Sequence, residues 1–298
     1  MGKAKTMSSN GLWDRLQLSA DMKEASNRLQ NSQVLLVGSG GLGSELALKL
    51  AGCRIGRITI VDGDTVSTAN IPHSAIFTPS HVGQHKVDVV ATFLREKFPG
   101  LTVTTVAKFI QQCDARALFG AHDLIVCAPD NDRTRVWVNY YAVTTLKRAV
   151  FVGIGGPGTE WSGYTFLYTP GESGCFVCFA TGGELVETIQ GSVAPVSEME
   201  TMEESRRRCG GENVPVPVLA PVVGVVAGIA ATVIVKTLIG VGRMSTYTHI
   251  DLKQPRKFVL ASGKERETYG LTSMCKKIPT CIVCGKPEEH DLPVPPTV

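Results

Sequence analysis

The sequence lacks a strong excess of charge of either sign. Its 298 residues include 30 lysines and arginines against 27 aspartates and glutamates, for a net charge of +3. The basic residues are dispersed rather than arranged in a stripe, whereas proteins that bind nucleic acid usually present a strongly basic face. We therefore expect no nucleic-acid partner. The composition, 43% hydrophobic and 19% charged, is that of a globular protein with an ample core.

The beginning of the sequence lacks the apolar stretch of a secretory signal. Residues 1–10 are polar, and we expect them to be disordered. The chain has nine cysteines, an odd number that does not suit a framework of paired disulfides. These features predict a protein of the reducing cytoplasm.

Long apolar runs are also scarce, and one segment alone is a candidate for a membrane span. Val214–Val235 carries no charge and is long enough to cross a bilayer. Pro215, Pro217 and Pro221 crowd its first third, so a helix can only begin near Pro221. Small and branched apolar residues on every face suit a helix buried between a sheet and a partner element. We expect such a helix, and no membrane partner.

Segments typical of strands alternate with segments typical of helices over the first half of the chain. The strands are predicted at 33–37, 57–62, 102–109, 123–128 and 149–153, and the helices at 11–31, 44–51, 84–98 and 131–147. This alternation indicates an α/β fold, with a doubly wound, Rossmann-like and mostly parallel sheet. Beyond it we predict antiparallel strands within 159–169, a polar segment, the apolar helix, and strands at 246–251 and 257–260.

Two pairs of cysteines have the spacing of metal-binding knuckles. They are Cys175-Phe-Val-Cys178 and Cys281-Ile-Val-Cys284. Each knuckle can offer two thiolates, and together they would complete the tetrahedral Cys₄ shell of a structural zinc site. The alternative is two redox pairs or ordinary buried cysteines. Because a closed Cys₄ site is structural, the chemistry of the protein is expected elsewhere.

A glycine-rich run marks a nucleotide site. Gly38, Gly40 and Gly43 form a GxGxxG motif directly after a predicted strand and at a helix start, where backbone N–H groups can approach phosphates. Asp62 ends the next strand about 20 residues later, as expected of a group that binds ribose hydroxyls. These residues suit a dinucleotide and ATP equally well.

Two further side chains favour ATP. Lys86 lies at a predicted helix start, where its ammonium group could reach phosphate oxygens. Asp130 follows a strand, at the edge of the sheet where ligands of open α/β folds bind, and could hold Mg²⁺. A nicotinamide enzyme needs neither group. Taken singly, Lys86 could be a surface cation and Asp130 a helix N-cap.

With these residues in place, the chain resembles the ThiF/MoeB/HesA family, the bacterial relatives of ubiquitin-activating enzymes, over residues 11–285. The resemblance rests on GSGGLGS (38–44), IVDGDTVSTAN (60–70), VGQHK (82–86), APDN (128–131), GESGCFVC (171–178), GVVAGI (224–229) and CIVCG (281–285).

The resemblance implies an adenylyltransferase. Such enzymes adenylate the C-terminal glycine carboxylate of a small ubiquitin-fold or sulfur-carrier protein that ends in Gly-Gly, and they release pyrophosphate. It also implies a sheet of about eight strands, a homodimer, and a crossover loop over the active site at Thr181–Asn213. We expect one adenylation domain at 11–285, with an ATP-binding half (11–155) and a zinc, crossover and substrate-binding half (156–285). Residues 286–298 are then a flexible tail.

The resemblance assigns roles to individual residues. Lys86 would contact phosphates, Asp130 Mg²⁺, Asp62 the ribose and Asn70 the phosphate region. The nucleotide would also contact the glycine loop formed by Gly38, Gly40, Gly41 and Gly43. A C-terminal carboxylate is already ionised at neutral pH, so its attack on the α-phosphate needs no general base. It needs positioning and neutralisation of the triphosphate charge.

The chain departs from the family pattern at a residue that contacts the phosphates in relatives. The family usually has N-x-x-R-Q, and this chain has Asn70-Ile-Pro-His73-Ser74. A neutral imidazole at His73 is a poor substitute for a guanidinium. Arg15, where relatives carry another phosphate-contacting arginine, could retain part of the role, and Arg135 is a further family-type position. The departure predicts weaker activity, an unusual substrate, or a nucleotide-binding partner without turnover.

A second departure concerns the reactive thiol. Relatives that form thioesters or persulfides carry a cysteine in or just after the crossover loop, and this chain has Pro215 at the matching position. Cys209, beside Arg206–Arg208, is the nearest candidate, since nearby cations favour the thiolate. A single cysteine in a loop can also be incidental.

Three other functions stay open from the sequence. One is the adenylation of a ribosomal peptide, and another is a zinc-stapled, non-catalytic module that binds nucleotide and a partner. The third is a nicotinamide oxidoreductase, which only the glycine loop supports. Cofactors expected for the leading function are ATP, Mg²⁺ and Zn²⁺.

Overall fold

A computed structural model describes most of the chain. The described residues are 13–17, 20–155, 160–181, 218–242, 245–253, 256–259, 265–268, 270–279, 281 and 283–285. Several predictions lie outside them: the disordered residues 1–10, the tail 286–298, and residues 182–213 of the crossover loop, which include Cys209. Pro215 lies outside them too.

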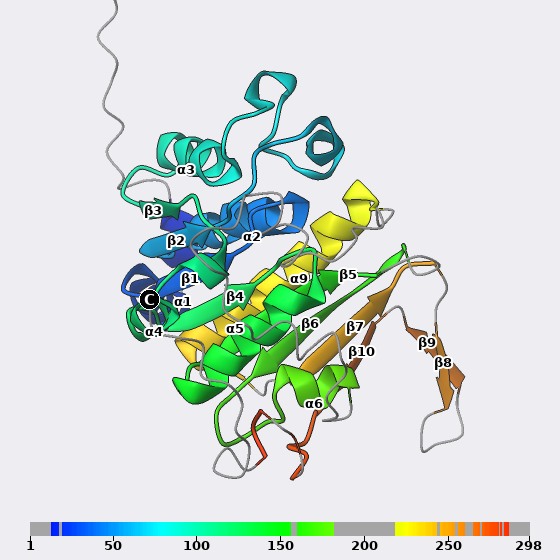
Figure 1. Ribbon diagram of the computed structural model, residues 1–298. Helices are drawn as coiled ribbons and strands as arrows, with labels where there is room; N and C mark the ends of the chain where they lie inside the picture. Colours follow the sequence, from blue (N-terminus) through cyan, green and yellow to red (C-terminus); the bar gives the residue numbers. More distant parts are fainter. Residues whose placement is uncertain are drawn as a thin grey trace, which may run out of the picture.

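The centre of the fold is an eight-stranded sheet with the order β10-β7-β6-β5-β4-β1-β2-β3 (Figure 1). Its strands are β1 (Gln33–Val37), β2 (Arg57–Val61), β3 (Thr102–Val106), β4 (Leu124–Cys127), β5 (Ala149–Ile154), β6 (Ser162–Tyr168), β7 (Tyr247–Asp251) and β10 (Gly270–Ser273). The five strands from β3 to β5 are parallel, and β6, β7 and β10 pair antiparallel. The predicted α/β fold class and strand number are confirmed.

A second, two-stranded sheet lies outside the main one. It is the antiparallel hairpin of β8 (Arg256–Val259) and β9 (Glu265–Thr268), which stands apart from β10 in Figure 1. The sequence predicted a strand close to β8 but neither β9 nor β10.

Helices cover both faces of the sheet and enclose two apolar cores. One core contains side chains of α1 (Ala20–Gln30), α2 (Gly41–Gly52), α3 (Lys86–Lys97) and α9 (Ala220–Ile239). The other contains side chains of α4 (Ala115–Gly120), α5 (Asp132–Thr144) and α6 (Phe176–Thr181). Short 3₁₀ turns are η2 (Asp14–Gln17), η3 (Thr68–His73), η4 (Pro79–His81) and η5 (Ile110–Gln112). This is the helix–sheet–helix layering of a doubly wound fold.

The long apolar helix α9 packs inside the protein. It begins at Ala220, beside Pro221 as predicted, and contacts α2, β5 and β6. Val226 packs tightly on β6, because a Cβ added to Gly163 would lie 2.5 Å from its Cγ2 atom. Among the described residues α9 is the one helix long and apolar enough to cross a membrane, but half of its apolar window is buried in the protein. The helix therefore gives only weak support to a membrane span.

The chain reverses direction across the sheet between β1 and β4. From β1 it passes through α2 to β2 on one side, and after β3 it crosses to β4 on the other side of β1. The segments that follow β1 and β4 therefore lead to helices on opposite faces of the sheet, α2 and α5, and the crevice between them is where open α/β sheets bind ligands.

Candidate functional site

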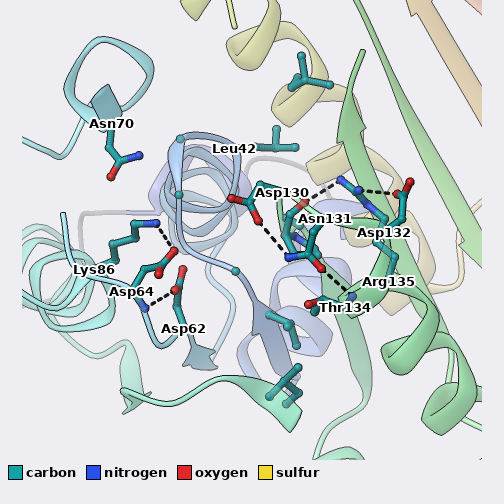
Figure 2. Close-up of a pocket in the computed structure, with 18 of the residues that line it drawn as sticks. Leu42, Asp62, Asp64, Asn70, Lys86, Asp130, Asn131, Asp132, Thr134 and Arg135 are labelled. Atoms are coloured by element: carbon teal, nitrogen blue, oxygen red, sulfur yellow. Dashed lines mark hydrogen bonds and ion pairs between the residues drawn. The ribbon is translucent and has the colours of Figure 1, made fainter. Parts of the chain in front are cut away.

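A cavity of about 550 Å³ opens at the carboxyl ends of β1, β2 and β4, at this reversal point (Figure 2). It is lined by Val37, Gly38, Gly40, Gly41, Leu42, Val61, Asp62, Asp64, Asn70, His73, Lys86, Phe109, Ile110, Gln111, Ala128, Pro129, Asp130, Asn131, Asp132, Thr134, Arg135, Ile154, Gly155, Tyr164, Val218 and Val223. Its size is typical of pockets that hold a small-molecule ligand. The cavity thus brings together most of the residues predicted from the glycine loop and the family motifs.

The glycine loop joins β1 to α2 and forms one wall of the cavity. Gly38 has a φ of +89°, and a Cβ at this position would lie 2.7 Å from the carbonyl oxygen of Ala128. A Cβ on Gly43 would clash with the carbonyl oxygen of Gly38, so these two positions need glycine. Gly40 caps α2 and has open space in front of it. The free N–H groups at this helix start make a site for phosphate.

Asp62 lies at the end of β2, but protein donors already occupy its carboxylate. The backbone N–H of Ser39 donates to Oδ2 at 2.7 Å, and the backbone N–H of Asp64 donates to Oδ1 at 2.9 Å. Burial raises the pKa of the Asp62 carboxyl. Asp62 thus fixes the glycine loop relative to the chain after β2, and its contact with a ribose stays a prediction.

Lys86 is held by an ion pair inside the cavity. Its Nζ atom lies 2.9 Å from Oδ2 of Asp64, and the side chains of Lys86 and Asp64 are only 10% and 22% exposed. Burial works against the ammonium form, but the carboxylates of Asp62 and Asp64 outweigh it and raise the pKa of Lys86. The lysine therefore stays charged, and a bound phosphate would compete with Asp64 for its ammonium group.

Asp130 follows β4 on the turn that leads into α5. The N-cap of α5 is Asn131, whose Oδ1 accepts from the backbone N–H of Thr134 at 2.8 Å. Asp130 is therefore not the helix cap. Asn131 also donates its Nδ2 to Oδ1 of Asp130 at 3.1 Å. Figure 2 shows the carboxylate of Asp130 in the cavity beside the start of α2, where it could ligate Mg²⁺.

Arg135 anchors the turn that carries Asp130. Its Nη1 donates to Asp132 at 2.8 Å and its Nη2 donates to the carbonyl oxygen of Pro129 at 2.7 Å. The guanidinium is buried, and its Nε has no hydrogen-bond partner among the described residues. Burial raises the pKa of neighbouring Tyr164 to about 12, so that phenol stays neutral. Arg135 is a central part of the site, although the sequence marked it only as a family-type position.

The 3₁₀ turn η3 brings Asn70 and His73 to the cavity. Asn70 accepts from the backbone N–H of Ser67 at 2.9 Å, which leaves its Nδ2 group for a ligand. A Cβ on Gly41 would lie 2.9 Å from both Cβ and O of His73, so the half-buried imidazole starts directly beside the glycine loop. Ser74 and Ser44 share a hydrogen bond of 2.8 Å that holds η3 on α2.

Two predicted site residues do not line the cavity. Gly43 acts through its close approach to Gly38, and Arg15 is exposed in η2. Conversely, no sequence motif pointed to Phe109, Gln111 and Thr134, which line the cavity just before η5, in η5 and on α5. The only available signal was their position just after the third and fourth strands of a parallel sheet.

The four knuckle cysteines converge in the structure. Their sulfur atoms all lie within 4.8 Å of one another, with Cys175 3.7 Å from Cys281 and Cys178 3.4 Å from Cys284. Zinc bound tetrahedrally by thiolates at about 2.3 Å separates the sulfurs by about 3.8 Å. All four residues are buried, and the geometry fits a closed metal site. No disulfide forms among the described cysteines.

A buried amide supports this cluster from α5. Asn139 donates its Nδ2 to the sulfur of Cys175 at 3.5 Å and accepts from the backbone N–H of Phe176 at 2.8 Å. Such second contacts orient metal ligands. Nothing in the sequence around Asn139 predicted this contact.

Known proteins resemble this chain over most of its length. The model of the ThiF family matches residues 14–271. The chain is 28% identical over 270 residues to the molybdopterin-synthase adenylyltransferase of Escherichia coli K12, covering 87% of this chain and 89% of that protein. It is 35% identical over 155 residues to the maize adenylyltransferase and sulfurtransferase MOCS3-1, covering 52% of this chain. The match covers 32% of the maize protein and 49% of a related uba4 protein from Emericella nidulans.

Solved structures show the same fold. A crystal structure of E. coli MccB with ATP superposes with a TM-score of 0.69 at 21% identity, covering 96% of this chain and 77% of MccB. The sequence relatives named above are adenylyltransferases, and the matched residues contain the glycine loop and all the cavity residues described. The chain therefore belongs to the ThiF family.

Proposed function

We propose that this chain is an adenylyltransferase that activates the C-terminal glycine carboxylate of a ubiquitin-fold or sulfur-carrier protein ending in Gly-Gly. The observation that carries the proposal is the cavity at the glycine loop, in which Lys86 and Asp130 flank the start of α2 in a ThiF-family chain. Residues 11–285 would form one adenylation domain, with the ATP-binding half at 11–155 and the zinc, crossover and substrate-binding half at 156–285.

The proposed reaction needs little from the protein beyond charge and geometry. An oxygen of the substrate carboxylate bonds to the α-phosphorus of ATP, and the bond from that phosphorus to the bridging oxygen breaks, so that pyrophosphate leaves. The N–H groups at the start of α2 and the ammonium of Lys86 would neutralise phosphate charge. Mg²⁺ held at Asp130 would supply further neutralisation when bound. Arg135 would keep the Asp130 turn in place.

The second metal would be structural. We assign Zn²⁺ to Cys175, Cys178, Cys281 and Cys284, because their sulfurs already have the separations of a tetrahedral shell. The metal would tie the end of the described chain to α6 and β6, and it has no open position for substrate.

The chain is proposed to act as a cytoplasmic homodimer. The free state of the described cysteines agrees with a reducing compartment. A second copy would have an apolar surface to cover on α9, where Pro221 and Val225 are exposed one turn apart with Gly224 beside them. Light scattering on the purified protein measures this directly, and a monomeric mass at micromolar concentration would exclude the dimer.

One observation favours a second candidate. Because His73 stands where the family usually has arginine, the chain could bind nucleotide and a partner without turnover. Pyrophosphate–ATP exchange separates the candidates, using the full chain with small Gly-Gly-terminated proteins encoded nearby. We expect exchange that depends on the partner and disappears when its terminal glycine is deleted. Partner binding without pyrophosphate exchange would support the second candidate, a non-catalytic module that binds nucleotide and a partner. Exchange only with a short ribosomal peptide would move the substrate class to peptides, and binding of a nicotinamide cofactor in place of ATP would refute both.

A further inference from the structure

One face of α5 carries two buried polar side chains. Arg135 and Asn139 are four residues apart, so they project from the same side of the helix. Arg135 is 8% exposed, and Asn139 has no exposed surface. Their neighbours on α5 pack in an apolar core, where a polar group costs free energy unless it is hydrogen-bonded. The partners of these two side chains therefore indicate what the helix connects.

Arg135 holds the turn on which Mg²⁺ is proposed to bind. Its Nη2 donates to the carbonyl oxygen of Pro129, the residue directly before Asp130, at 2.7 Å. Its Nη1 donates to Asp132, the first residue of α5, at 2.8 Å. These bonds tie the chain on both sides of Asp130 to α5. A displacement of the helix would therefore move the Asp130 carboxylate within the cavity.

Asn139 holds the first cysteine knuckle. Its Nδ2 donates to the sulfur of Cys175 at 3.5 Å, and its Oδ1 accepts from the backbone N–H of Phe176 at 2.8 Å. The amide thus contacts one sulfur of the four-cysteine cluster and the backbone at the start of α6. A metal that fixes Cys175 also fixes Asn139, and loss of the metal would release this side of α5.

The two anchors are about one helical turn apart. At a rise of about 1.5 Å per residue, Arg135 and Asn139 are separated by roughly 6 Å along the helix axis. Both lie within the continuous helix Asp132–Thr144, whose buried side chains share one core with Cys175 and Phe176. A shift at the knuckle therefore reaches the Asp130 turn through one packed element.

We propose that α5 couples the zinc site to the magnesium site, with Asn139 as the positioning residue that connects them. This step rests on the proposed function, in which Zn²⁺ binds the four cysteines and Mg²⁺ binds at Asp130. Zinc fixes Asn139, Arg135 follows on the same helix, and Asp130 is held where it can ligate a cation. Coupling between two binding sites is reciprocal, so ATP with Mg²⁺ raises the affinity for zinc by the same factor as zinc raises the affinity for ATP with Mg²⁺.

The first test uses the wild type alone. The zinc affinity of the full chain is measured by equilibrium competition with a zinc-selective dye, with and without saturating ATP and Mg²⁺. Calorimetry measures the binding of ATP with Mg²⁺ to the zinc-loaded and the zinc-free protein. We expect each ligand to tighten the other by about fivefold or more, the lower end of the usual range for coupled sites. ATP still binds the zinc-free protein, but more weakly.

A variant at Asn139 tests the connection itself. Asn139→Leu removes both hydrogen bonds and nearly keeps the size of the side chain. It should bind zinc roughly ten- to a hundredfold less tightly, as is usual when a contact to a metal ligand is lost, and it should lose the response to ATP with Mg²⁺. The matched control Val138→Ala, at the neighbouring fully buried position on α5, should lower the melting temperature but keep the response.

A second variant tests the other end of the path. Asp130→Asn should keep the zinc affinity of the wild type and lose the response to ATP with Mg²⁺. It also shows that zinc bound by free ATP is not the cause of the response. Cobalt in place of zinc adds a spectroscopic readout: its thiolate charge-transfer band should shift when ATP and Mg²⁺ bind the wild type or Val138→Ala, and stay unchanged in Asn139→Leu.

The outcomes separate this inference from the function on which it rests. If the wild type binds both ligands without any mutual effect, the coupling does not exist, and the proposed function stands. A full response in Asn139→Leu would remove Asn139 from the path and overturn the inference. If the wild type binds no ATP, the adenylyltransferase function fails and the coupling fails with it.

Discussion

The imidazole of His73 can be tested by restoring the arginine that the family usually carries. His73 starts directly beside the glycine loop, since a Cβ added to Gly41 would lie 2.9 Å from the Cβ of His73, and it lines the cavity. The longer side chain of His73→Arg would extend from this point toward the phosphates. Because η3 is held on α2 through Ser74 and Ser44, the substitution should leave the backbone in place.

The expected gain follows from one charge-assisted contact. A hydrogen bond between a guanidinium and a phosphate contributes about 1.5–3 kcal/mol, which corresponds to roughly ten- to a hundredfold in kcat/KM. The lower end of this range is the better expectation, because Asp64 and Asp130 line the same cavity and could compete for the new guanidinium.

The assay is partner-dependent pyrophosphate exchange at varied ATP. We expect His73→Arg to raise kcat/KM for ATP, and the control Gln84→Arg, which adds a cation at an exposed site outside the cavity, to leave it unchanged. A rise in both variants would indicate a general effect of charge. Flat ATP affinity with impaired partner adenylation would mean that His73 serves the partner. No change in either quantity would refute the reasoning and leave Arg15 as the next phosphate ligand to test.

Three other perturbations follow from the described contacts. Cys281→Ser or zinc chelation should remove the bound metal, which elemental analysis measures. Proteolysis near the end of the chain should then increase, while ATP binding persists. Metal-free protein with unchanged proteolysis would contradict this. Asp130→Asn should abolish exchange without lowering the melting temperature, because Asn131 rather than Asp130 caps α5. Lys86→Met should weaken ATP binding and cost about 3 kcal/mol of stability, because Asp64 and buried Asp62 lose their cation. Burial raises the pKa of the Asp62 carboxyl, so this loss of stability should shrink as the pH falls toward that raised pKa, because protonation removes the buried negative charge. Urea denaturation at several pH values measures the change.

The parallel half of the fold could be predicted from local patterns. The strand at 33–37 matches β1, because a run of buried apolar residues ends at glycine. The predicted helix at 44–51 corresponds to α2, which already begins at Gly41, since backbone geometry rather than side-chain periodicity starts that helix. The predicted strand at 102–109 already ends at Val106, and residues 107–109 lead into the turn η5.

Features that depend on contacts between residues far apart in the chain could not be predicted from the sequence. β10 pairs with β7 across the edge of the sheet, and its short sequence has no strand signal of its own. The same holds for the site: the motifs marked Lys86, but nothing local showed that Asp64 would hold it. Gln111 and Asn139 make hydrogen bonds to Thr134 and Cys175, which the fold brings to them from distant parts of the sequence.

The charges around the cavity explain why its missing arginine should matter. Among the described residues, the charged side chains that line it are Asp62, Asp64, Asp130, Asp132, Lys86 and Arg135. Lys86 and Arg135 are each already paired with an aspartate, so the wall carries an excess of negative charge before a triphosphate enters. A phosphate that attracts Lys86 takes its ammonium group away from Asp64, and no arginine at position 73 offsets this. More of the neutralisation must therefore come from the start of α2 and from a divalent cation at Asp130 than in relatives with the usual arginine.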